Sequence, residues 1–119
     1  MWAYKDILEL LNVQAATYWL TLQKEFDIGI SCPDIALSKK SDNMQDLAIA
    51  YAYCEENILV FNKQFLKRNV KVITTEILLH ELAHFAAYAI DGCDNHGKTW
   101  RQVMRVLGLK CKTHYKITH

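Results

Sequence analysis

Glycine and proline are scarce in this sequence, which has four glycines and one proline among 119 residues. Collagen-like repeats and proline-rich linkers need far more of both, so these classes are excluded. Long apolar runs are missing as well, because no stretch reaches the roughly 18 residues that a membrane-spanning helix needs. The first ten residues also lack the basic and then apolar pattern of a secretory signal. These absences predict a cytoplasmic protein without a membrane partner.

The cysteines show no closely spaced pairs. Cys32, Cys54, Cys93 and Cys111 are separated by 22, 39 and 18 positions, whereas zinc ribbons and redox motifs use CxxC pairs, whose cysteines are three positions apart. A cysteine-ligated zinc ribbon is therefore excluded. In an intracellular chain we expect these side chains to be reduced thiols.

Apolar residues make up 51% of the chain and charged residues 23%, which is typical of a folded domain rather than a disordered segment. The length predicts one domain over residues 1–119, and we expect a monomer. Residues 1–94 hold eight basic and 13 acidic side chains, whereas residues 95–119 hold six basic ones and no acid. A basic end attracts polyanions, and it is equally typical of a solvated helix face followed by a basic tail.

Apolar residues spaced three and four apart predict helices at three places. The first spans residues 2–26, and the second runs from about residue 74 to 90, where Asp91 and Gly92 form a stop signal. Thr74 or Thr75 is expected to cap this second helix. A third helix is predicted from about 98 to 107, with Gly108 at its C-terminal end.

Alternating apolar residues predict strands between the first two helices. In residues 47–54, Leu, Ile and Tyr alternate with Ala and Cys, which indicates a strand whose alanine face packs against a helix. Residues 58–62 form the return strand, and residues 35–38 form a further short strand before a polar turn at 38–43. A helix remains the alternative for 47–54, because alanine is the best helix former. For the tail from residue 111, the sequence leaves two alternatives, a strand or a frayed end.

The sequence His80-Glu81-Leu82-Ala83-His84 carries the most specific chemical signal. Residues four apart lie on one helix face, so both imidazoles can reach one ion at roughly 2.0–2.1 Å. Glu81 lies about 100° round the helix from His80, too oblique for a ligand but suited to contact a water on the metal. Such a carboxylate takes the proton of water as it attacks a carbonyl. The alternative is two surface histidines beside a solvated glutamate.

A catalytic zinc site normally has three protein ligands and one open position. Metzincin spacing would place the third histidine at position 90, which is Ile90, so that class is excluded. His96 is preferred, because a short loop after the helix stop can fold it over the metal. His114 is either a neighbour of the site or an unrelated surface residue. The full set of candidates is His96, His114, His119, Asp91 and Asp94.

HELAH (80–84), HGKTW (96–100) and RQVMRVLGL (101–109) together resemble the SprT-like metalloprotease family. The family pattern is HExxH, a short loop, then HGxxW or HGxxF leading into a helix that ends in LG. ILVFNKQFL (58–66) resembles the family's segment before the active-site helix, and Lys112-Thr113-His114 resembles its segment after the LG turn. The resemblance covers about residues 47–115.

The resemblance implies a zincin-like α+β domain with an N-terminal helix, a small antiparallel sheet, the HExxH active-site helix and a C-terminal helix. It implies a Zn²⁺-dependent metalloendopeptidase with His80, His84 and His96 as ligands, Glu81 as general base, and a protein or peptide substrate. Trp100 would pack the loop of His96 onto the core. The family includes Spartan, which degrades proteins covalently trapped on DNA, so the basic residues 98–116 are the expected DNA contact.

We expect no C-terminal cysteine-rich zinc ribbon of the kind that many family members carry. Two other functions stay open beside the peptidase. One is a catalytically inactive, zinc-stabilised module that binds nucleic acid, and the other is a hydrolase of non-peptide amides or esters. The intact Glu81 favours the peptidase over the module, because a structural zinc site has a fourth protein ligand and needs no base.

Overall fold

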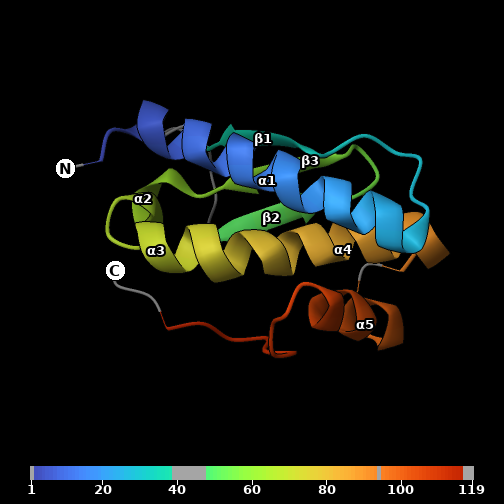
Figure 1. Cartoon of the computed structure of the whole chain (residues 1–119). Helices are drawn as coiled ribbons and strands as arrows, with labels where there is room; N and C mark the ends of the chain where they lie inside the picture. The colour runs from blue at the N-terminus through green and yellow to red at the C-terminus, as the bar shows by residue number, and fades with distance from the viewer. Residues whose placement is uncertain (1, 39–47, 94, 117–119) are drawn as a thin grey trace.

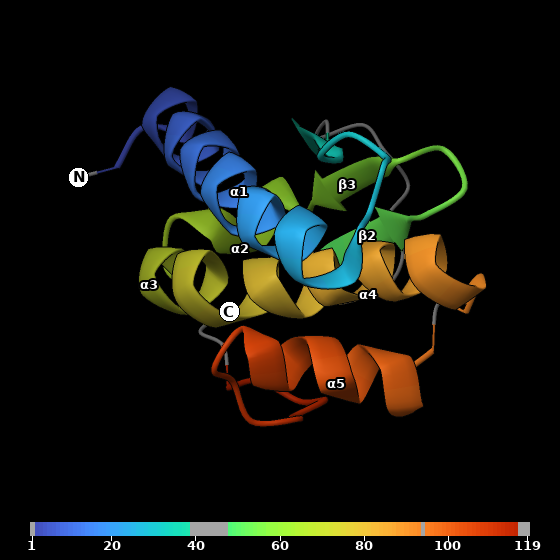
Figure 2. The ribbon, with the colours of Figure 1, turned by 45° about the vertical axis from the view of Figure 1, so that its right-hand side comes forward.

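The computed structural model describes residues 2–38, 48–93 and 95–116 of the chain. It combines helices with a small sheet, in agreement with the expected α+β class. Helix α4 runs through the middle, with α1 and the sheet on one side and α5 on the other (Figure 1 and Figure 2). The elements in chain order are α1 (Tyr4–Phe26), β1 (Asp34–Leu37), β2 (Ala50–Tyr53), β3 (Ile58–Phe61), α2 (Lys63–Leu66), α3 (Val70–Val72), the π-helical η1 (Ile73–Ile77), α4 (Leu78–Asp91) and α5 (Lys98–Val106).

Three of the expected features fall partly outside these ranges. They are residues 39–43 of the polar turn, the first residue of the strand expected at 47–54, and the last three residues of the tail. Within the described ranges, no helix is both long enough and apolar enough to cross a membrane.

Helix α1 forms because its apolar side chains recur on one face. The indole of Trp19 donates a hydrogen bond of 3.0 Å to the carbonyl of Ile30 beyond the helix end, which turns the chain toward β1. The predicted helix is confirmed, beginning two residues later than expected. The face that packs against α4 and β1 consists of Ile7, Leu11, Ala15, Trp19 and Leu22.

The three strands form one sheet in the order β1-β3-β2. β2 and β3 pair antiparallel, with Tyr51 opposite Val60, as the predicted hairpin requires. β1 pairs with β3 in parallel, with Ile35 opposite Leu59. The prediction of an antiparallel sheet is therefore wrong, since the sheet is mixed. Alternation along a strand shows which of its faces is buried, but it does not show which neighbouring strand it pairs with. Here β1 pairs with β3 and not with β2, the next strand in sequence.

The alanine face of β2 packs as expected. Ala50 and Ala52 lie against the core on the side where β2 contacts α4. Tyr51 and Tyr53 point to the opposite face, where their rings stack with centroids 6.4 Å apart. The small alanine side chains let the strand approach α4, and the helix alternative for this segment is wrong.

One continuous helical stretch runs through α3, η1 and α4. Inside it the N–H of Leu78 bonds to the carbonyl of Ile73, five residues back, which is the π-helical pattern. The start predicted near residue 74 is too late, because helical backbone begins at α3. The predicted stop is confirmed: Gly92 has a left-handed φ of 76°, and its N–H bonds to the carbonyl of Tyr88 at 2.8 Å.

The threonines at 74 and 75 do not cap this stretch. The hydroxyl of Thr74 donates to the carbonyl of Val70 at 2.7 Å, and that of Thr75 donates to the carbonyl of Lys71 at 2.6 Å. Both bonds join carbonyls of the same helix, whereas a cap would accept from the N–H groups at a helix start. The predicted capping role is wrong.

Helix α5 ends as expected. Gly108 has a φ of 78°, its N–H bonds to the carbonyl of Arg105, and the N–H of Leu109 bonds to that of Met104. These two bonds form a Schellman motif. The chain then returns beneath α4 as residues 109–116, here called the C-terminal segment (Figure 1). No strand forms in this part of the tail.

Candidate metal centre

Helix α4 is buried on several sides because it lies between α1 with the sheet and α5. Its two histidines, His80 and His84, are four residues apart and therefore lie on one face. Their exposed fractions are 6% and 8%. Polar rings at this depth need partners, because burying an unpaired polar group costs free energy.

His96 reaches this face from the loop that joins α4 to α5. The hydroxyl of Thr99 donates to the carboxylate of Asp91, which ties the two helix ends together. Inside the loop, the N–H of Gly97 donates to the side-chain oxygen of Asn95 at 3.0 Å. A β-carbon at position 97 would lie 2.6 Å from that oxygen, so a larger residue there would displace the exposed Asn95 side chain.

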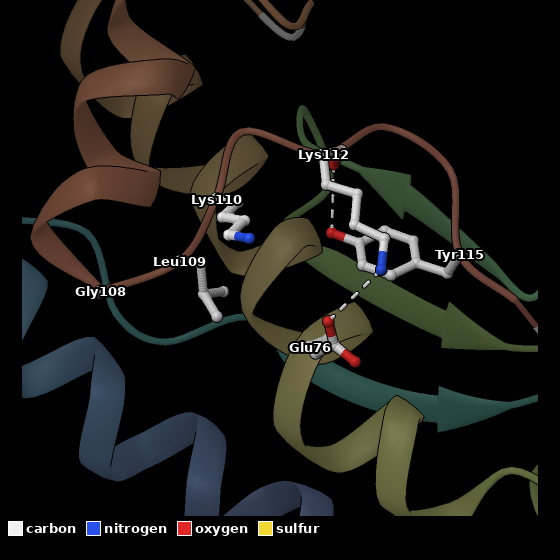
Figure 3. Close-up of a pocket in the computed structure, with 6 residues that line it drawn as sticks. All are labelled: Glu76, Gly108, Leu109, Lys110, Lys112 and Tyr115. Atoms are coloured by element: carbon white, nitrogen blue, oxygen red, sulfur yellow. Dashed lines mark hydrogen bonds and ion pairs between the residues drawn. The ribbon is translucent and has the colours of Figure 1, made fainter.

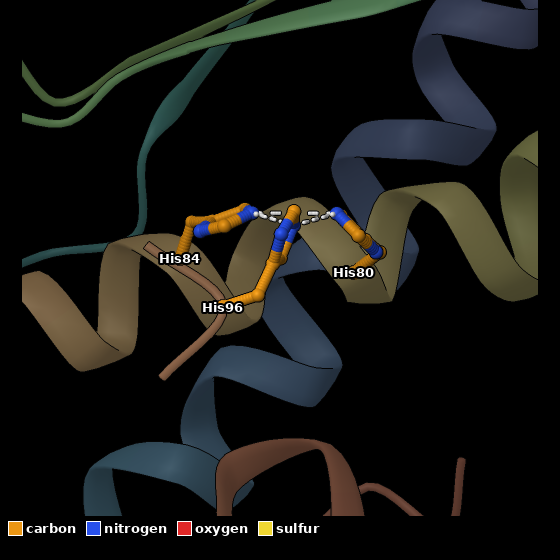
Figure 4. Close-up of side chains that lie close together, drawn as sticks. All are labelled: His80, His84 and His96. Atoms are coloured by element: carbon orange, nitrogen blue, oxygen red, sulfur yellow. Dashed lines mark hydrogen bonds between the residues drawn. The ribbon is translucent and has the colours of Figure 1, made fainter. Parts of the chain in front are cut away.

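The Nε2 atoms of His80, His84 and His96 form a nearly equilateral triangle (Figure 4). They are separated by 3.3 Å between His80 and His84, 3.1 Å between His84 and His96, and 3.2 Å between His96 and His80. The ligand atoms of a tetrahedral ion with bonds of roughly 2.0–2.1 Å lie about 3.3 Å apart. The three rings therefore fit a tetrahedral ion such as zinc, and they could hold one metal ion.

Trp100 packs against all three histidines from α5. Its ring centroid lies 4.9 Å from that of His80, 5.7 Å from that of His84 and 4.6 Å from that of His96. The side chain is buried, and its indole N–H donates to the carbonyl of His80 at 3.2 Å. The expected role of Trp100 in packing the His96 loop onto the core is confirmed.

The rings of His80 and His96 are biased toward the neutral form, which is the form that binds metals. Burial lowers the pKa of His80 to about 4, and the neighbouring His96 adds to the effect. Burial also lowers the pKa of His96, with smaller contributions from the neighbouring Arg101 and His114. At neutral pH both rings therefore offer an uncharged nitrogen.

Glu81 follows His80 on α4 and has a different environment. Its Oε1 lies 3.9 Å from the Nε2 of His80, and its side chain is 14% exposed. Burial raises the pKa of this carboxyl group to about 8. Both residues line a pocket of about 280 Å³, bordered by residues 48–50 at β2 and 113–115 of the C-terminal segment. A molecule entering this pocket meets His80 of the histidine cluster and the carboxyl group of Glu81 together.

Of the other candidate ligands, the two that the structure describes, His114 and Asp91, do not join the cluster. His114 is exposed and lines the same pocket as His80, so it is a neighbour of the site. Asp91 accepts hydrogen bonds from Thr99 and from the N–H of Cys93. Asp94 and His119 lie outside the described residues.

Sequence reasoning missed one side chain at the site. The hydroxyl of Tyr115 lies 3.0 Å from the Nδ1 of His80. The two residues are 35 positions apart, so no helical or strand spacing links them. The only signal was that Tyr115 follows directly on the Lys112-Thr113-His114 segment already singled out.

Comparison with known proteins identifies relatives of this chain. The family model described as SprT-like family matches residues 16–119. Protein SprT of Actinobacillus succinogenes is 30% identical over 93 residues, which cover 76% of this chain and 52% of that protein. Protein SprT of Vibrio parahaemolyticus is 32% identical over 96 residues, covering 79% of this chain and 55% of that protein. The chain thus spans about half the length of these curated relatives.

No solved structure matches the chain. The family match nevertheless covers most of the sequence, including the three clustered histidines and Glu81. On this evidence the chain belongs to the SprT-like family.

Proposed function

We propose that this protein is a zinc-dependent metalloendopeptidase with a zincin-like active site. The observation that carries the proposal is the triangle of Nε2 atoms, 3.1–3.3 Å on a side, with Glu81 beside it at a pocket. His80, His84 and His96 would hold the metal. Three protein ligands leave one position of a tetrahedral ion open, which is the arrangement of catalytic rather than structural zinc.

The roles of the protein groups follow from their positions. When bound, zinc supplies Lewis acidity, which polarises a carbonyl group and makes a water molecule more acidic. Glu81 would accept a proton from water as the water oxygen bonds to the carbonyl carbon, and deliver it to the amine as the C–N bond breaks. Trp100 and the hydrogen-bonded loop keep the third histidine in place.

Glu81 must be ionised to accept a proton. Its pKa of about 8 means that burial alone keeps most of the group protonated at neutral pH. Positive charge held at the Nε2 of His80, 3.9 Å from the Glu81 oxygen, lowers this pKa by charge attraction. A cation bound at the histidine cluster would therefore shift Glu81 toward the ionised form that can accept a proton.

We further propose that the substrates are proteins bound or crosslinked to DNA. The support is the distribution of charge, because all six basic side chains after residue 94 are exposed. These residues would contact phosphates and give binding that weakens as salt rises. We propose the cytoplasm as the location, or association with the nucleoid or nucleus if the protein acts on DNA, and a monomer as the state. The basic residues are Lys98, Arg101, Arg105, Lys110, Lys112 and Lys116.

The test compares the wild type with Glu81→Gln, using Glu9→Gln on the exposed side of α1 as the matched control. Zinc content is measured first, followed by cleavage of a protein crosslinked to single-stranded DNA and of the same protein without DNA. We expect all three proteins to bind one zinc, and only Glu81→Gln to lose cleavage, by about 100-fold or more. Cleavage by Glu81→Gln at the wild-type rate would remove Glu81 from the mechanism.

The same assays separate the alternative functions. DNA binding by a zinc-loaded wild type that cleaves neither substrate would favour the inactive nucleic-acid-binding module. Cleavage that is unaffected by DNA and by salt would argue against the DNA-linked substrate while leaving the peptidase in place.

A further inference from the structure

We propose that Tyr115 is a positioning residue of the metal centre, acting through His80. Its hydroxyl lies 3.0 Å from the Nδ1 of His80, and the carbonyl oxygen of Lys112 lies 3.3 Å from the same atom. The opposite nitrogen, Nε2, is the atom that faces the other two histidines. The inference rests on the metal site proposed above but not on peptidase activity.

The proton positions follow from the chemistry of the three groups. The carbonyl of Lys112 can only accept, and the hydroxyl of Tyr115 donates to it at 3.2 Å. Because its hydrogen is directed at Lys112, the tyrosine oxygen is left with its lone pairs and accepts a hydrogen bond from the N–H at Nδ1 of His80. A neutral imidazole protonated at Nδ1 is unprotonated at Nε2. The network therefore selects the tautomer of His80 that can bind a metal through Nε2.

Further contacts hold Tyr115 in this position. Figure 3 shows Lys112 extending over the tyrosine ring toward Glu76 of η1. The Nζ of Lys112 lies 3.7 Å from the Glu76 carboxylate and 5.0 Å from the centre of the Tyr115 ring. The planes of the Tyr115 and His80 rings are nearly perpendicular, at 83°, with ring centroids 5.4 Å apart. The C-terminal segment is thus tied to the helix that carries the first two histidines.

Two roles of Tyr115 predict different behaviour. If the hydroxyl orients His80, removing only that oxygen should weaken metal binding. If the ring serves only as packing, phenylalanine should replace tyrosine without loss. Hydrogen-bonded partners of metal-binding histidines typically contribute 10-fold to 100-fold to metal affinity, which is large enough to distinguish the two roles.

The experiment measures the zinc affinity of the full chain by competition with a chromophoric chelator at fixed pH. Tyr115→Phe removes the hydroxyl and keeps the ring, and Tyr115→Leu removes both. Tyr18→Phe, a half-buried tyrosine on α1, is the matched control. Thermal unfolding of each metal-free protein shows whether the fold is retained. The visible absorption of the Co²⁺-loaded proteins reports the coordination geometry without any use of activity.

We expect Tyr115→Phe to weaken zinc binding about 10-fold and to alter the Co²⁺ spectrum, with metal-free unfolding close to that of the wild type. Tyr18→Phe should match the wild type in all three measurements. An unchanged affinity for Tyr115→Phe, with a loss only for Tyr115→Leu, would overturn the inference in favour of packing. A wild type that binds no zinc would overturn the metal site itself, and with it this inference.

Discussion

The hydroxyl of Thr99, in the first turn of α5, donates a hydrogen bond to the carboxylate of Asp91, the last residue of α4. The same carboxylate accepts from the N–H of Cys93 at 2.9 Å. These bonds lower the pKa of Asp91, with the bond from Thr99 contributing most. They close a short loop, and His96 is the residue of that loop that reaches the histidine cluster.

We therefore expect Asp91→Ala to weaken zinc binding on the order of fivefold, because the loop would have to be ordered when the metal binds. Asp6→Ala, which removes an exposed carboxylate from α1, is the matched control and should leave the affinity unchanged. Chelator competition measures both. Equal affinities for the two variants would show that the Asp91 bonds do not order the His96 loop.

Zinc should raise the stability of the folded protein, because the complete cluster exists only in the folded chain. At a free zinc concentration about 100 times the dissociation constant, the gain is about 2.7 kcal/mol. For a domain of this size that corresponds to a rise in Tm of roughly 10 °C. Thermal unfolding with and without a chelator measures it. His84→Ala, which removes one ligand, should show no such rise, and an equal rise would place the bound metal elsewhere.

Leu82 lies between the two histidines of the motif in sequence and is fully buried in the core. Leu82→Ala should lower the free energy of unfolding by about 3 kcal/mol, through lost apolar burial and the cavity that remains. Leu20→Ala on α1 is the matched control, because Leu20 is 60% exposed. Denaturant titration compares the two. A loss below about 1 kcal/mol at position 82 would contradict its place in the core.

Cys32 should react slowly with alkylating reagents. Burial raises the pKa of its thiol to about 11, and the negative charge of Asp34 adds to the effect. At pH 8 about one thousandth of such a thiol is ionised, against about a quarter of an unperturbed one, and the thiolate is the reactive form. Mass spectrometry after timed iodoacetamide treatment should find Cys32 modified well after the exposed Cys93. Asp34→Asn should speed the reaction at Cys32, and a rate at Cys32 equal to that at Cys93 would contradict the predicted shift.

Much of the fold could be predicted from local patterns. The apolar spacing of α1, the alternation in β2 and β3, and the glycine stop at Gly92 each depend on residues close in sequence. The parallel pairing of β1 with β3 depends on contacts between distant segments, which alternation does not encode. The π-helical turn was missed because Thr74 and Thr75 read as caps, whereas their hydroxyls bond to carbonyls inside the helix.

The residues of the candidate site also differ in whether local sequence spacing could predict them. His80 and His84 could be paired from sequence because one helical turn separates them. His96 could be assigned to the site only from a longer motif, since its position depends on a loop closed by Thr99 and Asp91. Tyr115 could not be predicted from helical or strand spacing, because the backbone path of the C-terminal segment brings its hydroxyl to His80.

Trp100 gives the histidine cluster a built-in optical reporter. Its indole touches all three imidazoles and is shielded from water, so its emission should lie toward the blue end of the tryptophan range. Trp2 is 44% exposed and lacks those contacts. A coloured ion such as Co²⁺ in the cluster would quench the indole beside it by energy transfer. Occupancy could then be followed by fluorescence, without dye or substrate.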